Sequence, residues 1–330
     1  MASAPYILTL SGDADMASVM GELARRGLWA RKLEVSSGPR LVEVDEKSRA
    51  VTVEELVGVA GVAHVAGRAS AHPLVDARRG RAVQVGKLFV GPGAAPLHIA
   101  GPCAVESEQQ IDRLAETVAQ AGARLLRGSA YKPRTSPYAF QGHGAPALAW
   151  LRAAADRQGL GVVTEVMTAE DAGRVAEVAD LVQVGSRNMQ NFSLLKAVGR
   201  QKRPVLLKRG MAASVEDWLL AAEYCLSEGS SGVVFCERGV RGFDPSMRNL
   251  LDLGAVALLV HALGQPVVVD PSHAAGRRDL IAALGRAGLA AGAHGLMVET
   301  HHDPAHALSD GPQALPPEEL AALFTTRGAP

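Results

Sequence analysis

The sequence predicts an α/β protein in which a (β/α)8 barrel, or TIM barrel, follows a small N-terminal domain. From residue 97 onward, eight short apolar segments alternate with eight helix-like segments over about 230 residues. That count and size are typical of this barrel. A doubly wound parallel sheet is the alternative fold for the same alternation. The eight repeats, and the lack of a Gly-x-Gly-x-x-Gly phosphate loop, favour the barrel.

The composition is that of an ordinary globular chain with a large apolar core. Of 330 residues, 48% are hydrophobic and 21% are charged, and 34 basic residues balance 34 acidic ones. A nucleic-acid or membrane-surface protein would show a basic excess, so neither kind of partner is expected. No apolar run approaches the roughly 20 residues of a membrane span. Three cysteines form no even disulfide framework, and no signal-peptide pattern opens the chain, so we expect a cytoplasmic protein.

The first 67 residues are expected to form a separate ferredoxin-like domain. Its strands and helices follow the order βαββαβ, the split βαβ plan. Met16, Val19 and Leu23 recur at helical spacing, Gly27 ends that helix, and Thr52 caps the second one. The expected elements are 6–10, 13–26, 29–35, 40–44, 53–57 and 62–66.

Residues 68–81 are expected to form an arginine-rich linker, and the barrel is expected over 82–330. A hairpin opens the barrel domain at 82–90, with Gly86 at its turn. Barrel strands are predicted at 97–100, 124–127, 161–165, 181–184, 204–208, 232–236, 266–270 and 295–299. Helices are predicted at 107–121, 146–158, 169–178, 191–198, 214–227, 246–262, 277–290 and 317–324.

In such a barrel, the residues that follow the strands meet at one end and form the functional site. Four of them are Cys103, His273, Glu299 and Asp310. One thiol, one imidazole and two carboxylates together suit a divalent first-row transition metal. Each residue alone is more commonly structural: a core cysteine, a capping histidine or a solvated carboxylate. Their arrival together at strand ends favours a metal site.

A second group at the same strand ends is basic: Arg127, Lys132, Arg134, Arg187, Lys208 and Arg238. One such arginine is usually part of a surface ion pair. Six at one end of a neutral protein would repel each other unless anions lay among them. Guanidinium groups match carboxylate and phosphate oxygens, so the pattern predicts a small, multiply anionic, phosphorylated substrate. Glu165 is the acidic exception, expected to orient a lysine or a water or to balance charge.

Several segments resemble the 3-deoxy-D-arabino-heptulosonate 7-phosphate (DAHP) synthases. They are GPCAVES (101–107), YKPRTSPY (131–138), LLKRG (206–210), VDPSH (269–273) and ALSDG (307–311). The resemblance covers about 82–325, and residues 1–67 resemble the ferredoxin-like regulatory domain of one microbial subgroup. It implies a 3-deoxy-7-phosphoheptulonate synthase, a transferase that condenses phosphoenolpyruvate with erythrose 4-phosphate. The products would be DAHP and phosphate, in the first step of the shikimate pathway of aromatic amino acid biosynthesis.

The resemblance also implies a role for each matched residue. A divalent metal (Mn, Fe, Co or Zn) would be bound by Cys103, His273, Glu299 and Asp310. Phosphoenolpyruvate would be bound by Arg127, Lys132, Arg187, Lys208 and Arg238. The phosphate of erythrose 4-phosphate would be bound by Arg134, Thr135 and Ser136. Lys132 is the expected proton donor and Glu165 would lie near the attacking water, so the expected catalytic group is Lys132, Cys103, His273 and Glu165. Segment 241–249, RGFDPSMRN, is atypical of the family and is not expected to touch the metal ligands.

Two other functions are weighed against this one. The related 3-deoxy-D-manno-octulosonate 8-phosphate synthase is implied to carry Lys-Ala-Asn-Arg-Ser-Ser where this chain has Lys-Pro-Arg-Thr-Ser at 132–136. A catalytically inactive barrel that serves as a metabolite sensor would be expected to lose metal or anion ligands, and none is missing.

Regulation and assembly are expected to depend on the N-terminal domain. It carries none of the expected catalytic residues, so we expect it to bind tyrosine or phenylalanine as an inhibitor, with a purely assembly-forming domain as the alternative. The resemblance implies a homotetramer. A docked chorismate mutase is a further partner that could coexist with catalysis.

Overall fold

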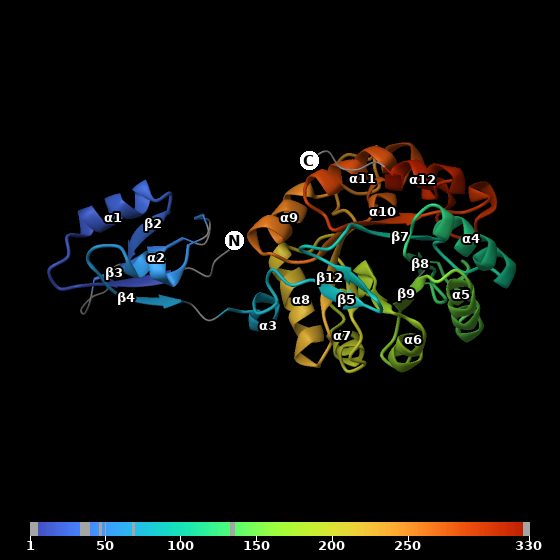
Figure 1. The fold of residues 1–330 in the computed structure, drawn as a ribbon, viewed down its shortest axis with the longest axis horizontal. Coiled ribbons are helices and arrows are strands. Elements are labelled where there is room, and N and C mark those ends of the chain that lie inside the picture. Colours follow the sequence, from blue (N-terminus) through green and yellow to red (C-terminus); the bar gives the residue numbers. More distant parts are fainter. Residues whose placement is uncertain are drawn as a thin grey trace. The chain divides into compact units, whose positions relative to one another are not determined.

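A computed structural model describes residues 6–33, 40–45, 48–49, 51–67, 70–132 and 136–325 of the chain. The chain divides into two compact units. One consists of residues 1–76 with the short segment 261–263, and the other of residues 77–260 and 264–330. Figure 1 shows both units as a ribbon and labels many of their elements.

The N-terminal unit contains a four-stranded antiparallel sheet and two helices in the predicted order βαββαβ, and then the short helix α3 (Pro73–Asp76). Its strands lie in the order β2-β3-β1-β4. The Asp15 carboxylate accepts from the Ser18 amide at the start of the first helix, and Thr52 and Glu55 form a capping box at the second. The elements are β1 (Tyr6–Leu10), α1 (Met16–Arg25), β2 (Ala30–Leu33), β3 (Leu41–Val44), α2 (Val53–Val57) and β4 (Val62–Gly67). Their apolar faces bury one core, which includes Leu8, Leu23, Val42 and Leu56.

The second unit is a closed barrel of eight parallel strands, which confirms the predicted fold class. The ring closes because the last strand pairs in register with the first, Gly295 opposite Leu97 through to Glu299 opposite Gly101. The strands, in chain and ring order, are β7 (Leu97–Gly101), β8 (Leu125–Arg127), β9 (Gly161–Val166), β10 (Leu181–Val184), β11 (Val205–Lys208), β12 (Val233–Glu237), β13 (Val267–Val269) and β14 (Gly295–Glu299).

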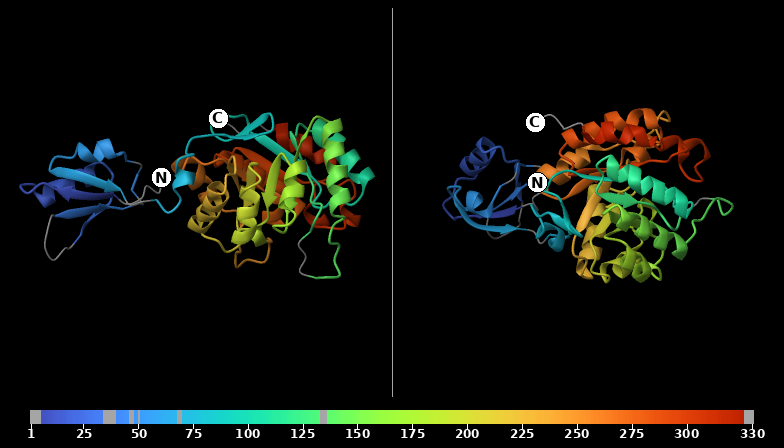
Figure 2. Two further views of the ribbon diagram at one scale, coloured as in Figure 1. Left: turned by 90° about the horizontal axis from the view of Figure 1, so that it is seen from below. Right: turned by 45° about the vertical axis from the view of Figure 1, so that its right-hand side comes forward.

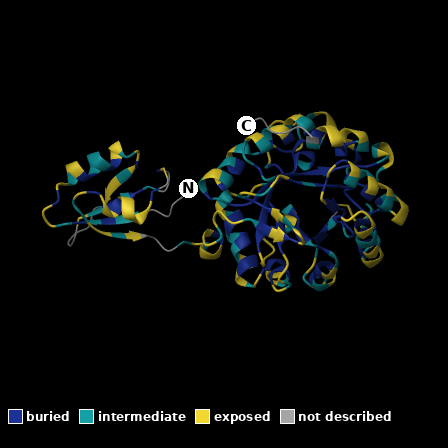
Figure 3. Cartoon of the chain, viewed as in Figure 1, coloured by how far each residue is buried: buried dark blue, intermediate teal, exposed yellow. Residues whose placement is uncertain are grey.

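Helices lie outside the strands, as Figure 2 shows from two further sides. In α4, Ser107 accepts from the Gln110 amide, and Ile111, Leu114 and Val118 are buried along one face, so cap and periodicity agree. The helices of this unit are α4 (Glu108–Gln120), α5 (Ala145–Arg157), α6 (Ala172–Val178), α7 (Phe192–Gly199), α8 (Val215–Ser227), α9 (Leu253–Ala257), α10 (Pro271–Ala275), α11 (Ile281–Ala290) and α12 (Pro317–Thr325). Figure 3 shows the strands as the buried interior and the outer helix faces as exposed.

A hairpin packs against one end of the barrel interior. It consists of β5 (Val83–Val85) and β6 (Leu88–Val90), as predicted from the turn at Gly86. Val83, Val85 and Val90 share one buried cluster with the barrel residues Leu97, Ile99, Leu125, Val163, Leu181, Leu206, Val234, Cys236, Val268 and Met297. Leu97, Leu125 and Leu181 are the first residues of their strands, so the hairpin covers the amino-terminal end of the barrel. The opposite end, where the strands have their carboxyl ends, remains open for the site.

Three predicted segments differ from the structure. The helix expected over 246–262 begins only at Leu253, because Asp252 caps it by accepting from the Ala255 amide. Residues 258–262 then form a turn of π-helix. A short helix, α10, follows β13 directly, because Asp270 accepts from the His273 amide and Pro271 occupies the first turn. The segment expected as a linker contains the short helix α3 (Pro73–Asp76).

No helix in the described ranges is both long and apolar enough to cross a membrane.

Candidate active site

Cys103 reaches the carboxyl end of the barrel through a tight passage at Gly101. Gly101 has φ of 148°, and a Cβ there would lie 2.0 Å from the backbone oxygen of Arg127. Only glycine allows the end of β7 to pass this close to β8. Pro102 follows, and the Cys103 side chain is then buried at the strand end, as the sequence predicts.

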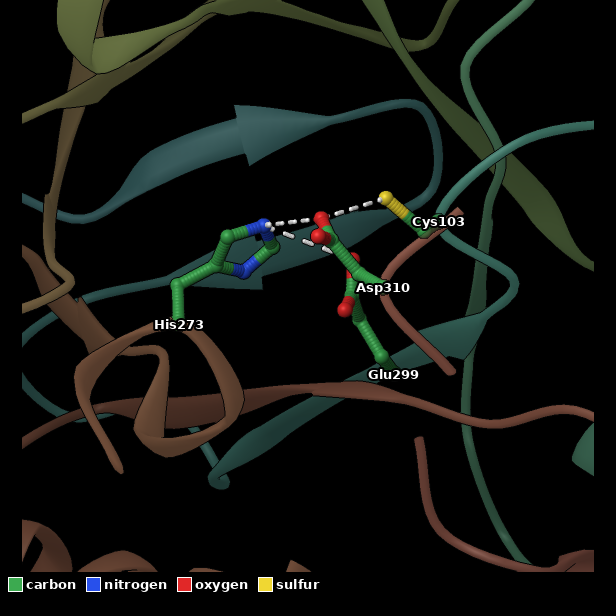
Figure 4. A group of neighbouring side chains, drawn as sticks. All are labelled: Cys103, His273, Glu299 and Asp310. Carbon is green, nitrogen blue, oxygen red and sulfur yellow. Dashed lines mark hydrogen bonds and ion pairs between the residues drawn. The ribbon is translucent and has the colours of Figure 1, made fainter. Parts of the chain in front are cut away.

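The structure brings Cys103, His273, Glu299 and Asp310 together, as Figure 4 shows. One ligand atom from each lies within 4.8 Å of the other three. The Nε2 atom of His273 is 3.4 Å from Oε1 of Glu299 and 4.0 Å from Oδ2 of Asp310. The Cys103 thiol donates to Oδ2 of Asp310 over 3.1 Å.

The surroundings of this cluster set the charge of its members. Burial raises the pKa of the Cys103 thiol to about 12, with a further contribution from the nearby Glu299 carboxylate. Burial alone would raise the pKa of Asp310 as well, but His273, the thiol hydrogen bond and Arg248 together lower it to about 2. Asp310 also has a left-handed backbone, with φ of 53°, which is uncommon outside glycine and is found at functional sites.

Donor chemistry and geometry both fit a divalent transition metal. One sulfur, one nitrogen and two oxygens converge from separate elements. Oε1 of Glu299 is buried and accepts no hydrogen bond from any described residue, although a buried carboxylate oxygen is normally satisfied. Its nearest cationic neighbours are Nη2 of Arg127 at 3.2 Å and Nε2 of His273 at 3.4 Å, and a bound cation would give this oxygen a direct ligand bond.

Lys132 lies between the cluster and an adjacent pocket. Its Nζ donates to Sγ of Cys103 over 2.9 Å and to the Cys103 backbone oxygen over 3.1 Å. Burial alone would lower the pKa of Lys132, but the neighbouring Cys103, Glu165 and Glu299 raise it above its ordinary value. The lysine is therefore held as a cation beside the sulfur.

The pocket next to the cluster has a volume of about 260 Å³ and a cationic lining. Its basic residues are Arg127, Lys132, Arg187, Lys208, Arg238 and Arg248. Arg127 is buried, yet its Nε and Nη1 atoms have no hydrogen-bond partner among the described residues, and neither does Nε of Arg238. Buried guanidinium donors without partners at a pocket wall indicate a missing anion.

Glu165 also lines the pocket, where Gln183 orients it. The amide Nε2 of Gln183, on the neighbouring strand, donates to Oε2 of Glu165 over 3.0 Å. Gly185 follows the same strand, β10, and a Cβ at this position would lie 2.1 Å from Oε1 of Glu165. A larger residue at position 185 would therefore displace this carboxylate.

The expected phosphate-binding loop is only partly described. Arg134 and Thr135 lie outside the described residues. Ser136 is described, is exposed, and does not belong to the lining of the cationic pocket.

Four supporting residues were missed in the sequence: Gln183, Arg248, Asp270 and Gln313. The expectation that 241–249 does not touch the metal ligands is wrong, because Nη1 of Arg248 lies 3.6 Å from Oδ1 of Asp310. The bridge between Val240 and Leu250 folds this segment back toward the barrel. Asp270 was visible only as part of the VDPSH motif, and Gln313 gave no signal in the sequence.

Fold and site together define a barrel enzyme with a candidate metal centre beside a pocket for small anions. The sequence profile of the DAHP synthetase I family matches residues 72–327, so the chain belongs to that family. A phospho-2-dehydro-3-deoxyheptonate aldolase from Thermotoga maritima is 48% identical over 233 residues, which cover 71% of this chain and 69% of that protein.

Two further comparisons give the structural and the more distant relatives. The crystal structure of the Thermotoga maritima phospho-2-dehydro-3-deoxyheptonate aldolase (DAHP synthase) matches with a TM-score of 0.73 and 37% identity, covering 97% of this chain and 96% of that one. A 2-dehydro-3-deoxyphosphooctonate aldolase from Acidithiobacillus ferrooxidans is 35% identical over 237 residues, covering 66% of this chain and 83% of that protein.

Proposed function

We propose that this protein is a DAHP synthase, which condenses phosphoenolpyruvate with erythrose 4-phosphate to give DAHP and phosphate. The observation that supports this most strongly is the set of unpaired guanidinium donors of Arg127 and Arg238 beside the four converging ligand atoms. A pocket of this kind suits two anionic substrates held next to a metal. The name of the Thermotoga maritima relative, a phospho-2-dehydro-3-deoxyheptonate aldolase, agrees with this reaction.

The metal would be held by Cys103, His273, Glu299 and Asp310, and Mn, Fe, Co and Zn all suit this donor set. A bound divalent ion supplies Lewis-acid polarisation of an aldehyde carbonyl.

Residues of the chain bind and position the two substrates. Arg127, Lys208 and Arg238 would hold the carboxylate and phosphate of phosphoenolpyruvate through charge-assisted hydrogen bonds. Carbon 3 of phosphoenolpyruvate then bonds to the aldehyde carbon. Water adds at carbon 2, and phosphate leaves as its C–O bond breaks. Positioning two repelling anions face to face supplies much of the rate.

Two residues are assigned to the protons of this reaction. Lys132, held as a cation beside Cys103, is the proposed proton donor to the oxygen of the former aldehyde. Glu165, oriented by Gln183, is proposed to lie near the attacking water.

The alternative is the octulosonate 8-phosphate synthase reaction, in which arabinose 5-phosphate replaces erythrose 4-phosphate. Two relatives with a name of that kind, from Acidithiobacillus ferrooxidans and Alkalilimnicola ehrlichii, are 35% and 34% identical, against 48% for the aldolase from Thermotoga maritima. The experiment is to incubate metal-loaded protein with phosphoenolpyruvate and erythrose 4-phosphate. Loss of phosphoenolpyruvate absorbance with equimolar release of phosphate and a seven-carbon product supports the proposal, and no turnover contradicts it.

The N-terminal unit is proposed to be regulatory. We take residues 1–67 as this domain, 68–81 as the linker and 82–330 as the catalytic barrel. The candidate metal ligands and the cationic pocket lie wholly in the barrel unit, so the N-terminal unit is free for another role. Tyrosine or phenylalanine is the proposed inhibitor, a homotetramer the proposed assembly, and the cytoplasm the proposed location. A chorismate mutase remains the proposed additional partner.

A further inference from the structure

The two carboxylate oxygens of Glu299 have different surroundings. Oε2 accepts a hydrogen bond from Nε2 of Gln313 over 2.6 Å. Oε1 accepts none from the described residues, and lies 3.2 Å from Nη2 of Arg127 and 3.4 Å from Nε2 of His273. Oε2 is therefore hydrogen-bonded to Gln313, whereas Oε1 forms an ion pair with Arg127 and faces the candidate ligand His273.

Gln313 can make this bond in only one orientation of its amide. Its Oε1 accepts from Nη1 of Arg248 over 2.8 Å, while its Nε2 donates to Glu299. A guanidinium only donates and an ionised carboxylate only accepts, so exchanging the amide nitrogen and oxygen would break both bonds. Gln313 is also 2% exposed, so water cannot readily replace either partner.

The turn that carries Gln313 also carries a candidate metal ligand. Asp310 has a left-handed backbone, and residues 311–313 after it form a short helical turn. The backbone N–H of Gln313 donates to the backbone oxygen of Asp310 over 3.2 Å. Gln313 thus belongs to the same rigid turn as Asp310 and reaches across to Glu299 on β14. Its side chain fixes the position of one ligand relative to another.

We propose that Gln313 is a positioning residue for the metal centre: it holds the Glu299 side chain and leaves Oε1 as the metal-binding oxygen. This inference rests on the proposed metal-dependent function. Partners that orient a ligand in this way commonly affect metal affinity by about 10- to 100-fold. Arg248 contributes through the amide, because it fixes which end of Gln313 faces Glu299.

The test is to titrate metal-stripped protein with Co²⁺ and to follow the thiolate-to-cobalt absorption that Cys103 would give. Gln313→Met keeps the side-chain length and removes both hydrogen bonds. We expect Co²⁺ to bind this variant about 10- to 100-fold more weakly than wild type, with the same absorption at saturation. The matched control is Gln120→Met, because Gln120 also donates its Nε2 to a glutamate, Glu116, but on the exposed face of α4. It should bind Co²⁺ as wild type does.

Two further variants keep the test decisive if Gln313→Met does not fold. Gln313→Glu retains an acceptor for Arg248 but places a carboxylate against Glu299, and should weaken Co²⁺ binding at least tenfold. Arg248→Met removes the donor that fixes the Gln313 amide together with the 3.6 Å contact to Asp310, and should weaken Co²⁺ binding by about tenfold. Circular dichroism and melting of the metal-free proteins establish which variants are folded.

The outcomes separate this inference from the function on which it rests. Wild-type affinity for Co²⁺ in a folded Gln313 variant, or in Arg248→Met where neither Gln313 variant folds, would overturn the positioning role alone. Failure of the wild-type protein to bind Co²⁺ would overturn the proposed metal centre as well.

Discussion

The Nζ of Lys208 and the Oδ2 of Asp270 lie 2.5 Å apart in a buried ion pair. Lys208 ends β11 and lines the cationic pocket, whereas Asp270 follows β13 and is fully buried. The same Asp270 oxygen is 2.8 Å from Nδ1 of His273. One carboxylate therefore holds a cation of the anion pocket and the imidazole of the candidate metal cluster.

Asp270→Asn should destabilise the metal-free protein strongly. The substitution removes one partner of a buried ion pair and leaves the Lys208 charge uncompensated, which costs about 3–5 kcal/mol in comparable cases. Denaturant unfolding of the metal-free protein measures the loss. The control is Asp112→Asn, which breaks the exposed pair with Arg157 and should change stability far less. Equal losses of unfolding free energy in the two variants would show that the buried Asp270 pair stabilises the protein no more than the exposed Asp112 pair does.

Removal of the metal should abolish activity. We expect turnover to disappear after exhaustive chelation and to return in part with Mn, Co, Fe or Zn. Cys103→Ser should bind less metal, because a hydroxyl is a poor substitute for a thiolate ligand. Metal content by elemental analysis and rate measurements check both points, with Cys225→Ser, a buried helix cysteine, as the control. Full turnover in thoroughly stripped protein would rule out metal dependence.

The basic residues should divide between the two substrates. Arg238→Ala should mainly raise the KM for phosphoenolpyruvate, and Arg134→Ala the KM for erythrose 4-phosphate. Loss of one charge-assisted contact costs about 1.5–3 kcal/mol, or about 10- to 150-fold in kcat/KM. Steady-state kinetics with each substrate varied in turn measure the effect. If both variants impaired the same substrate alone, this division would be wrong.

Deletion of residues 1–67 should leave an active barrel that tyrosine and phenylalanine no longer inhibit. The barrel has its own buried core and holds the whole candidate site. Inhibition assays on the intact and shortened proteins compare the two. If neither amino acid inhibits the intact enzyme at millimolar concentration, the proposed regulatory role is wrong and the N-terminal domain would serve assembly alone.

The barrel could be predicted from the sequence because its strands are buried on both faces and are mostly apolar. Every residue of Leu181–Val184 and of Val205–Lys208 is buried, so each strand is a continuous buried run between polar segments. The helix expected from 246 was wrong because contacts distant in the sequence determine the structure of this segment. Residues 248 and 249 donate their amides to the backbone oxygens of Ala275 and Ala274 instead of to a helix.

The supporting residues of the site were much harder to predict. Arg248, Asp270 and Gln313 act through partners that lie 14 to 65 residues away in the chain. No periodicity or spacing relates such positions, and only the closed barrel brings them together. The proximity of the four candidate metal ligands, and of the pocket cations other than Arg248, could be predicted because the carboxyl ends of parallel strands meet at one end of a barrel.

The proposed function requires erythrose 4-phosphate to be the preferred aldose phosphate. The most direct measurement is the ratio of kcat/KM for erythrose 4-phosphate to kcat/KM for arabinose 5-phosphate, determined on metal-loaded protein at saturating phosphoenolpyruvate. We predict a ratio above about 100, because a site built around one phosphorylated aldose discriminates through its polar contacts. A ratio below one would contradict the DAHP synthase assignment and favour the octulosonate 8-phosphate reaction.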